Sequence, residues 1–113
     1  MPVRPATRYL VLIYLQPGQT EALRLYENRA LPVFERHGGR FEQILRPAPD
    51  GSAADPDVPD EVHLLCFDTP DGLDAVRRDP EMVALRPLRR EVVRRAVLVR
   101  VEDVPLERYF AGL

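Results

Sequence analysis

The chain has 113 residues, a formal net charge of −2 and one cysteine. This length suits one domain and not two, and a lone cysteine excludes an intrachain disulfide. The charge gives no general attraction to nucleic acid or anionic lipid. The longest apolar run, Leu10 to Leu15, is too short to span a membrane, and the first residues lack the apolar stretch of a signal peptide. We therefore expect a cytoplasmic domain that binds neither nucleic acid nor membrane.

The N-terminal third predicts an arm, a strand and a helix. Residues 1–7 contain two prolines and no pattern, which indicates a flexible arm. Tyr9 to Leu15 is apolar on both faces, as in a central strand that is covered on both sides. A helix should begin with Thr20 as its cap and end at His37-Gly38-Gly39, with Gly39 in a left-handed conformation. Pro32 should kink or divide this helix. Its expected buried stripe consists of Leu23, Tyr26, Ala30, Val33 and Phe34.

Two further strands follow, separated by a loop. Arg40 to Arg46 alternates loosely and predicts an edge strand, with Phe41, Gln43 and Leu45 on one face. Pro47 to Pro59 is rich in Pro, Ala and Asp and is expected to be a loop. Val62 to Phe67 predicts a second central strand.

The last third predicts a helix, a second helical piece and a strand. Thr69 is placed as a cap with Pro70 at the first helical position. Asp79-Pro80 should break this helix, and Glu81 to Arg90 should continue as one short helical piece. Ala96 to Val101 predicts the final strand.

This order of elements predicts a ferredoxin-like βαββαβ fold of the α+β class. Its four-stranded antiparallel sheet would carry the helices on one face, over residues 8–103. The central strands are apolar on both sides, and no further helix exists to cover the other face. We therefore expect a homodimer in which a second sheet covers the first, forming a dimeric α+β barrel.

Residues 104–113 predict a tail with one apolar helical face, because Leu106, Tyr109, Phe110 and Leu113 fall at helical spacing. So short a helix is marginal alone. We expect it to dock on the barrel, near the dimer interface or the mouth of a pocket.

Three stretches of the sequence resemble a known family. They are Pro32 to Phe41; Leu64 to Pro70 with Asp79-Pro80-Glu81 and Leu85 to Arg89; and Ala96 to Glu102. Together they are similar to an uncharacterised-domain family of the dimeric α+β barrel superfamily, whose relatives include antibiotic-biosynthesis-type monooxygenases, muconolactone isomerases and EthD-like proteins. The resemblance implies the fold and says little about function. Two departures from the family pattern are a Pro47–Asp60 loop without the usual Gly-rich hairpin and Cys66 at a position where relatives often carry an acid.

Ligand-binding members of this superfamily use a pocket beside the sheet, so polar groups on the strands are the candidates. Arg40 is the expected clamp for a carboxylate or enolate, and a salt bridge to a nearby acid is its alternative role. His63 is the first candidate base, because imidazole exchanges protons near neutral pH. A hydrogen-bonded core histidine is the alternative. Asp68 is the second candidate base, with helix entry as its structural role.

Tyr14 and Cys66 are further candidates for contact with a substrate. The Tyr14 hydroxyl could bond a substrate oxygen, or simply anchor the core. Cys66 could be a nucleophile only with a basic partner close by, and an inert buried thiol is the alternative. No cofactor is expected, and a haem would need His63 or His37 as its ligand. No metal is expected either, because neither zinc-type spacing nor a complete calcium loop is present.

One segment of the chain is basic. From Arg77 to Arg95 there are seven arginines against three acidic residues, a local net charge of +4. This patch could attract an anionic ligand or pair with the acidic loop of a partner subunit.

The leading functional hypothesis is a barrel that binds a small molecule, acting without a cofactor as a monooxygenase, isomerase or cyclase on an aromatic, polyketide-like or enolisable substrate. The alternative is a non-catalytic accessory or stress-related module whose barrel is filled by its own side chains.

Overall fold

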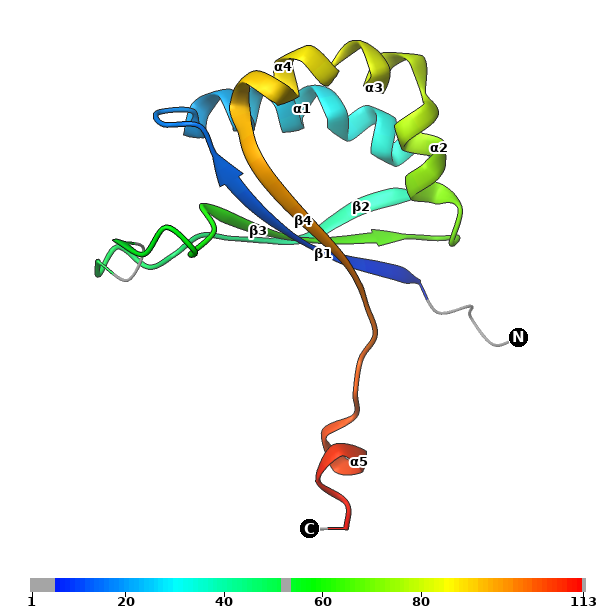
Figure 1. Cartoon of the computed structure of the whole chain (residues 1–113). Helices are drawn as coiled ribbons and strands as arrows, with labels where there is room; N and C mark the ends of the chain where they lie inside the picture. Colours follow the sequence, from blue (N-terminus) through cyan, green and yellow to red (C-terminus); the bar gives the residue numbers. More distant parts are fainter. Residues whose placement is uncertain (1–5, 52–53, 113) are drawn as a thin grey trace.

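The computed structural model describes residues 6–51 and 54–112. Its elements in chain order are β1 (Thr7–Leu15), α1 (Thr20–Arg36), β2 (Gly39–Leu45), β3 (Glu61–Phe67), α2 (Gly72–Arg78), α3 (Pro80–Ala84), α4 (Arg86–Val92), β4 (Val93–Val101) and α5 (Leu106–Phe110). The four strands form one antiparallel sheet in the order β2-β3-β1-β4, and α1 to α4 lie together on one of its faces (Figure 1). The predicted ferredoxin-like α+β fold is confirmed. The arm expected over residues 1–7 lies mostly outside the described residues, and Thr7 already belongs to β1.

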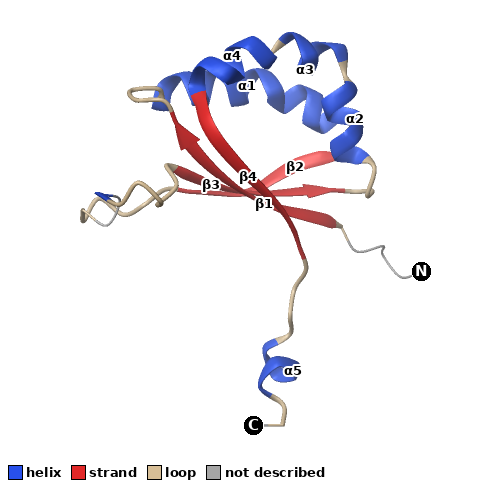
Figure 2. Ribbon diagram, in the orientation of Figure 1, coloured by secondary structure: helices blue, strands red, loops and turns tan. Residues whose placement is uncertain are grey.

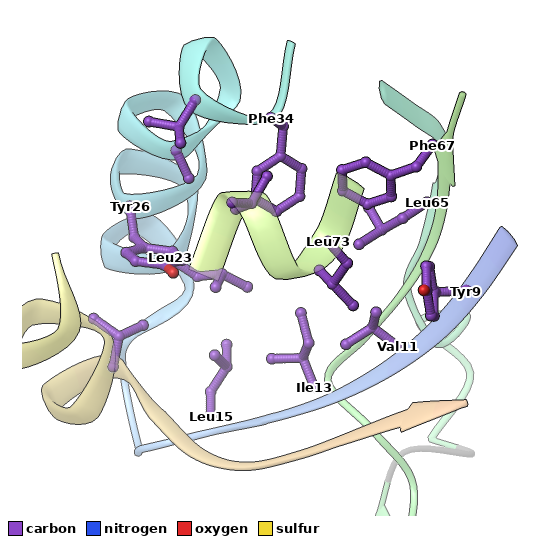
Figure 3. Packing of buried hydrophobic residues seen from close by; sticks show 14 residues of the cluster. Tyr9, Val11, Ile13, Leu15, Leu23, Tyr26, Phe34, Leu65, Phe67 and Leu73 are labelled. Carbon is purple, nitrogen blue, oxygen red and sulfur yellow. The ribbon is translucent and has the colours of Figure 1, made fainter. Parts of the chain in front are cut away.

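The core lies between the sheet and the helices (Figure 3). Alternate residues of β1 and β3 point toward the helices, because successive side chains of a strand face opposite sides. The stripe predicted for α1 is buried against them. Each large apolar side chain buried in this way contributes roughly 1.5–3 kcal/mol to stability. The sheet contributes Tyr9, Val11, Ile13, Leu15, Leu65 and Phe67 to this core.

The opposite face of the sheet is not covered by any of the helices α1 to α4 (Figure 2). We call it the open face. Leu10, Leu12, Val62 and Leu64 on the two central strands are only half-buried there, and Val99 on β4 is 43% exposed. Within one chain, the helices therefore cover only one of the two apolar faces of the central strands.

Helix α1 differs from the expectation at both of its marked positions. Of the two effects expected of Pro32, a kink or a division, the division is wrong, because the helix runs unbroken through this residue. The missing amide leaves the carbonyl four residues earlier without its helical partner, and the exposed position of Pro32 lets water take its place. Thr20 is the first helical residue rather than the cap; Gln19 precedes it and makes no side-chain capping bond.

The second helical segment is more fragmented than the sequence indicated. Helix α2 begins at Gly72, so Thr69 and Pro70 precede it and do not cap it. The predicted break at Asp79-Pro80 is confirmed, because the Asp79 carboxylate accepts a bond from the Glu81 amide and caps α3. The expected single piece beyond it is two short helices, α3 and α4, which meet at Leu85.

Strand β2 is an edge strand, as expected, but its register shifts between Phe41 and Gln43. Phe41 pairs with Leu65 and Ile44 pairs with His63, so Phe41 and Ile44 both lie on the face of the sheet that the helices cover. The prediction that Phe41, Gln43 and Leu45 share one face is therefore wrong. One extra residue in a strand moves every later side chain to the other face.

The two glycines that end α1 act for different reasons. Gly38 has the positive φ, +76°, that a left-handed turn requires. Gly39 does not, which corrects the expectation; its missing side chain makes room for Phe67. A Cβ on Gly39 would lie 2.5 Å from Cε1 of Phe67 and 3.0 Å from the Phe34 carbonyl oxygen.

Gly39→Ala should therefore destabilise the protein through Phe67. We expect a cost of about 1–3 kcal/mol in the free energy of unfolding, measured by urea denaturation. In a Phe67→Leu background the same change should cost at least about 1 kcal/mol less, because the ring atoms that clash are gone. Additive effects of the two substitutions would show that Gly39 is required for another reason.

Candidate ligand-binding site

A cavity of about 460 Å³ lies between the helix layer and the sheet. Its walls are mostly apolar, with side chains from all four strands and from α1, α2 and α3. Its polar groups are Glu27 and Tyr26 on α1 and His63 on β3, together with four arginines: Arg77 on α2 and Arg86, Arg89 and Arg90 on α4. A cavity of this size, apolar with a few converging polar groups, fits a small organic ligand. The apolar lining residues are Val11, Ile13, Phe34, Phe41, Leu65, Leu73, Val76, Met82, Val93 and Leu98.

His63 is held in this cavity by two acids. The side chain is 2% exposed, and its Nε2 lies 2.7 Å from Oε1 of Glu61, two residues earlier on the same face of β3. The other oxygen of Glu61 accepts a bond of 2.9 Å from Nε of Arg46. With Glu61 as acceptor, Nε2 carries the proton, so Nδ1 of a neutral imidazole is the nitrogen that can accept one. Nδ1 lies 3.9 Å from Oε1 of Glu27.

Glu27 is the second ionisable group of the cavity. The pKa of its carboxyl is raised to about 7, mainly by burial and also by the charge of Glu61, while Arg89 acts in the opposite sense. The neighbouring Tyr26 has a pKa raised to about 12, again mainly by burial. Glu27 therefore exchanges its proton near neutral pH beside the imidazole of His63, and Tyr26 remains a neutral hydroxyl. The pair can give or take a proton within an apolar site.

The structure separates the five residues that the sequence singled out. His63 lies in the cavity, whereas Arg40 pairs with Cys66 across β2 and β3 and faces away from it. Arg40 forms its alternative contact, a salt bridge of 3.2 Å to Asp68, and both side chains are exposed. Tyr14 also lies on the open face, where its hydroxyl donates to the Asp57 carbonyl. Only His63 is thus placed to meet a ligand in this cavity.

Cys66 is buried on the open face. Burial is the main cause that raises the pKa of its thiol, and Glu42 adds to this, while Arg40 and Arg8 act in the opposite sense. A thiol held protonated is a weak nucleophile, because the thiolate is the reactive form. The surroundings of Cys66 therefore favour the inert role.

Glu27 and Arg89 were missed by sequence reasoning, and Glu27 had a readable signal. It lies four residues after Leu23 and three before Ala30, so it falls inside the apolar stripe of α1. A charged residue at an inward position is rarely buried without a partner or a function. Arg89 had no such signal, because one arginine among seven in a basic segment is not distinguished by spacing.

A second polar cluster joins α1 to α3. Asp79 is 7% exposed and accepts bonds of 2.9 Å from Arg36 and from Nε2 of His37. The bond from His37 is the main cause that holds the pKa of Asp79 below its usual value. These contacts are satisfied within the chain, so the cluster fixes the end of α1 against the start of α3. His37 was expected at a helix end, and it occupies the C-cap of α1.

No protein-family model and no curated protein sequence matches the chain. Solved structures do. A protein of unknown function from Rhodopseudomonas palustris has a TM-score of 0.70 and 22% identity over 88% of this chain and 83% of its own. A dimeric ferredoxin-like protein of unknown function from Bacteroides fragilis has a TM-score of 0.56 and 17% identity, over 90% of this chain and 100% of its own. A proposed antibiotic biosynthesis monooxygenase from Nitrosomonas europaea has a TM-score of 0.61 and 17% identity, over 88% of this chain and 99% of its own. At these identities the likeness shows the fold alone, and it agrees with the predicted ferredoxin-like α+β architecture.

None of the helices in the described part of the chain has the length and apolar character needed to cross a bilayer. Within residues 6–51 and 54–112, no three His, Cys, Asp or Glu side chains are grouped so that they could hold a metal ion.

The raised pKa of Glu27 makes stability depend on pH. The folded state holds this proton up to about pH 7, whereas the reference pKa is 4.5. Between these values the folded chain binds more protons than the unfolded one, so its stability falls as the pH rises, and the loss is complete above about pH 7. The loss attributable to Glu27 is at most roughly 3 kcal/mol.

Glu27→Gln should remove this dependence, because the amide is neutral at every pH. We expect the variant to gain stability relative to the wild type between pH 5 and pH 8 in urea denaturation. Glu35→Gln, on the exposed side of α1, is the control, and its stability should change between pH 5 and pH 8 as that of the wild type does. A wild type and a Glu27→Gln variant with parallel pH profiles would contradict the assignment.

Proposed function

We propose that the protein binds a small organic molecule in the cavity between helices and sheet, and that His63 transfers a proton to or from it. The observation that supports this is the buried imidazole fixed by Glu61 at one nitrogen, with the other nitrogen toward Glu27. A carboxylate that orients an imidazole in this way is a common arrangement for a general base. An open cavity is also less expected of a module whose barrel is filled by its own side chains.

The reaction class follows from the groups available. Nδ1 of His63 would accept the proton of an acidic C–H bond, and the electron pair of that bond would pass into an adjacent carbonyl to form an enolate. Return of the proton at another atom completes an isomerisation, and attack of the enolate carbon on a carbonyl completes a cyclisation. The apolar walls favour an aromatic or enolisable substrate. Oxygenation would begin with the same proton removal and would use molecular oxygen as the oxidant; the likeness to the proposed monooxygenase supports it at the level of the fold.

Proton exchange at carbon tests this role. Aromatic ketones and β-diketones are incubated with the protein in deuterium oxide, and loss of the C–H signal is followed by NMR. We expect His63→Gln to slow the exchange by about 100-fold or more, the usual contribution of a general base, with ligand binding retained. His37→Gln is the matched control and should keep the rate.

Leu98→Trp provides a second test that does not disturb the buried polar cluster. Leu98 lines the cavity from β4 and is 38% exposed, so an indole there should fill the cavity and abolish both binding and exchange. Full exchange in His63→Gln would overturn the role of the histidine. Absence of any binding by the wild type would overturn the cavity proposal and favour the non-catalytic module.

We also propose that the open face is covered by a second copy of the chain. Its apolar residues are half-exposed in the single chain, and a second sheet would bury them, contributing about 25 cal/mol per Å² of apolar surface. The neighbour from Bacteroides fragilis, which is described as dimeric, supports the proposal. Arg40, Asp68, Tyr14 and Cys66 all lie toward this face, so any contact with a substrate would be made in a space enclosed by the dimer.

The C-terminal tail belongs to the same proposal. Helix α5 stands clear of its own domain, on the side of the open face (Figure 1). Leu106, Tyr109 and Phe110 are 72%, 67% and 56% exposed. The expected docking of the tail is therefore absent within one chain. We infer that α5 packs on the partner subunit, which lies on the side toward which the tail extends.

Deleting residues 106–113 should weaken the dimer. We expect the full chain to sediment at twice the monomer mass of 12.9 kDa and the truncated chain to dissociate at a higher concentration. Phe110→Ser should act in the same direction, whereas Arg108→Ser is the control and should not. A truncated protein that keeps its dimeric mass on dilution would mean that the tail is a frayed end, and a monomeric full chain would overturn the dimer itself.

A further inference from the structure

Four arginines gather on one side of the cavity. Arg77 lies in the last turn of α2, and Arg86, Arg89 and Arg90 lie on α4; all four line the cavity. Among the described residues that line the cavity, Glu27 is the only acid. The cavity therefore has an excess of positive charge at one wall, although the whole chain has a net charge of −2.

These arginines have few acidic partners in the described part of the chain. Arg77 is 4.0 Å from Asp74, and Arg89 interacts with Tyr26 and Glu27. Arg86 donates only to the backbone carbonyl of Arg77, at 3.2 Å, and Arg90 only to that of Arg86, at 3.5 Å. Two neighbouring guanidinium groups are thus held by carbonyls without a carboxylate to neutralise them. Like charges so placed repel one another, and a bound anion would relieve that repulsion.

The rest of the cavity is of the opposite character. Phe34 and Phe41 are stacked 5.5 Å apart, nearly parallel, and the ring of His63 meets Phe41 edge-on. Leu65 and Leu73 continue this apolar wall. A ligand that satisfies both parts has an apolar or aromatic body and an acidic group at one end.

We propose, building on the function proposed above, that the ligand is an organic anion whose acidic group is bound by Arg86 and Arg90 and whose body lies against the Phe34–Phe41 wall. Arginine suits this task, because its planar group makes two parallel hydrogen bonds to a carboxylate. The basic segment of the sequence then serves the cavity. The helix layer faces away from the proposed dimer interface, so these arginines do not meet the acidic loop of a partner.

Two fluorescent probes with the same rings distinguish the effect of a ligand's negative charge from binding in the cavity itself. Anilinonaphthalene sulfonate is an aromatic anion, and phenylnaphthylamine has the same rings without the sulfonate. We expect the anion to bind the wild type more tightly than the neutral probe. An Arg86→Gln/Arg90→Gln double variant should weaken anion binding by roughly tenfold or more and leave binding of the neutral probe unchanged. Added salt should weaken only the anion.

The control is Arg29→Gln/Arg78→Gln. It removes the same charge from two exposed arginines that do not line the cavity, and it should keep anion binding. Leu98→Trp, which fills the cavity, should reduce the binding of both probes and so show that they are not held on the open face.

The other possible outcomes distinguish failure of the proposed function from failure of the anion proposal. If neither probe binds the wild type in the cavity, the proposed function fails and the anion proposal fails with it. If both probes bind equally, and the Arg86/Arg90 variant changes neither, the cavity stands and the anion proposal is overturned. Equal loss in the Arg29/Arg78 control would show a general effect of net charge, which also overturns it.

Discussion

The packing of Phe67 is the contact on which the rest of the structure depends. The side chain is fully buried at the end of β3, beside the rings of Tyr9 and Phe34. Two glycines lie against its ring, and a Cβ on Gly39 or on Gly72 would come within 2.5 Å of it. One aromatic ring thus sets where α1 gives way to β2 and where α2 begins. The helix layer is fastened to the sheet at this end, and α2 to α4 lead back over the sheet from there.

Away from Phe67, the space between the helices and the sheet contains buried polar groups that a core needed only for stability would not require. An aliphatic side chain at position 27 would avoid the desolvation of a carboxyl group. A leucine at position 63 would need no buried carboxylate beside it, so Glu61 could also be apolar. Instead His63 and Glu61 are buried together as a hydrogen-bonded pair, and Arg46 completes the hydrogen bonds of Glu61. Buried ionisable groups add little net stability even when they are well paired. Their concentration around one cavity is typical of a functional site.

The fold could be predicted because it depends on local patterns: alternation in the strands, helical spacing in α1, and the Asp79-Pro80 break. The errors arose where tertiary contacts overrule local rules. The bulge in β2 has no sequence marker, so Gln43 and Leu45 were wrongly expected on the same face as Phe41. Gly39 was read as a turn glycine, but its role is set by Phe67, which lies far from it in sequence. For the site, a place on a strand made His63 and Arg40 candidates alike, but the sequence did not show which face of the sheet each one occupies. The structure places His63 in the cavity and not Arg40. The strand neighbour of Arg40, Cys66, shows that Arg40 faces away.

Strand β3 also connects the two surfaces of the domain. Glu61, His63, Leu65 and Phe67 point toward the helices, and Val62, Leu64 and Cys66 point toward the open face. The same seven residues therefore form one wall of the cavity and part of the surface that the proposed second copy would cover. Because packed interiors resist local deformation, a dimer that fixes the even-numbered side chains also fixes the backbone that carries His63. A catalytic imidazole must be held within a fraction of an ångström. On this view the second subunit supports the site without contributing a residue to the cavity.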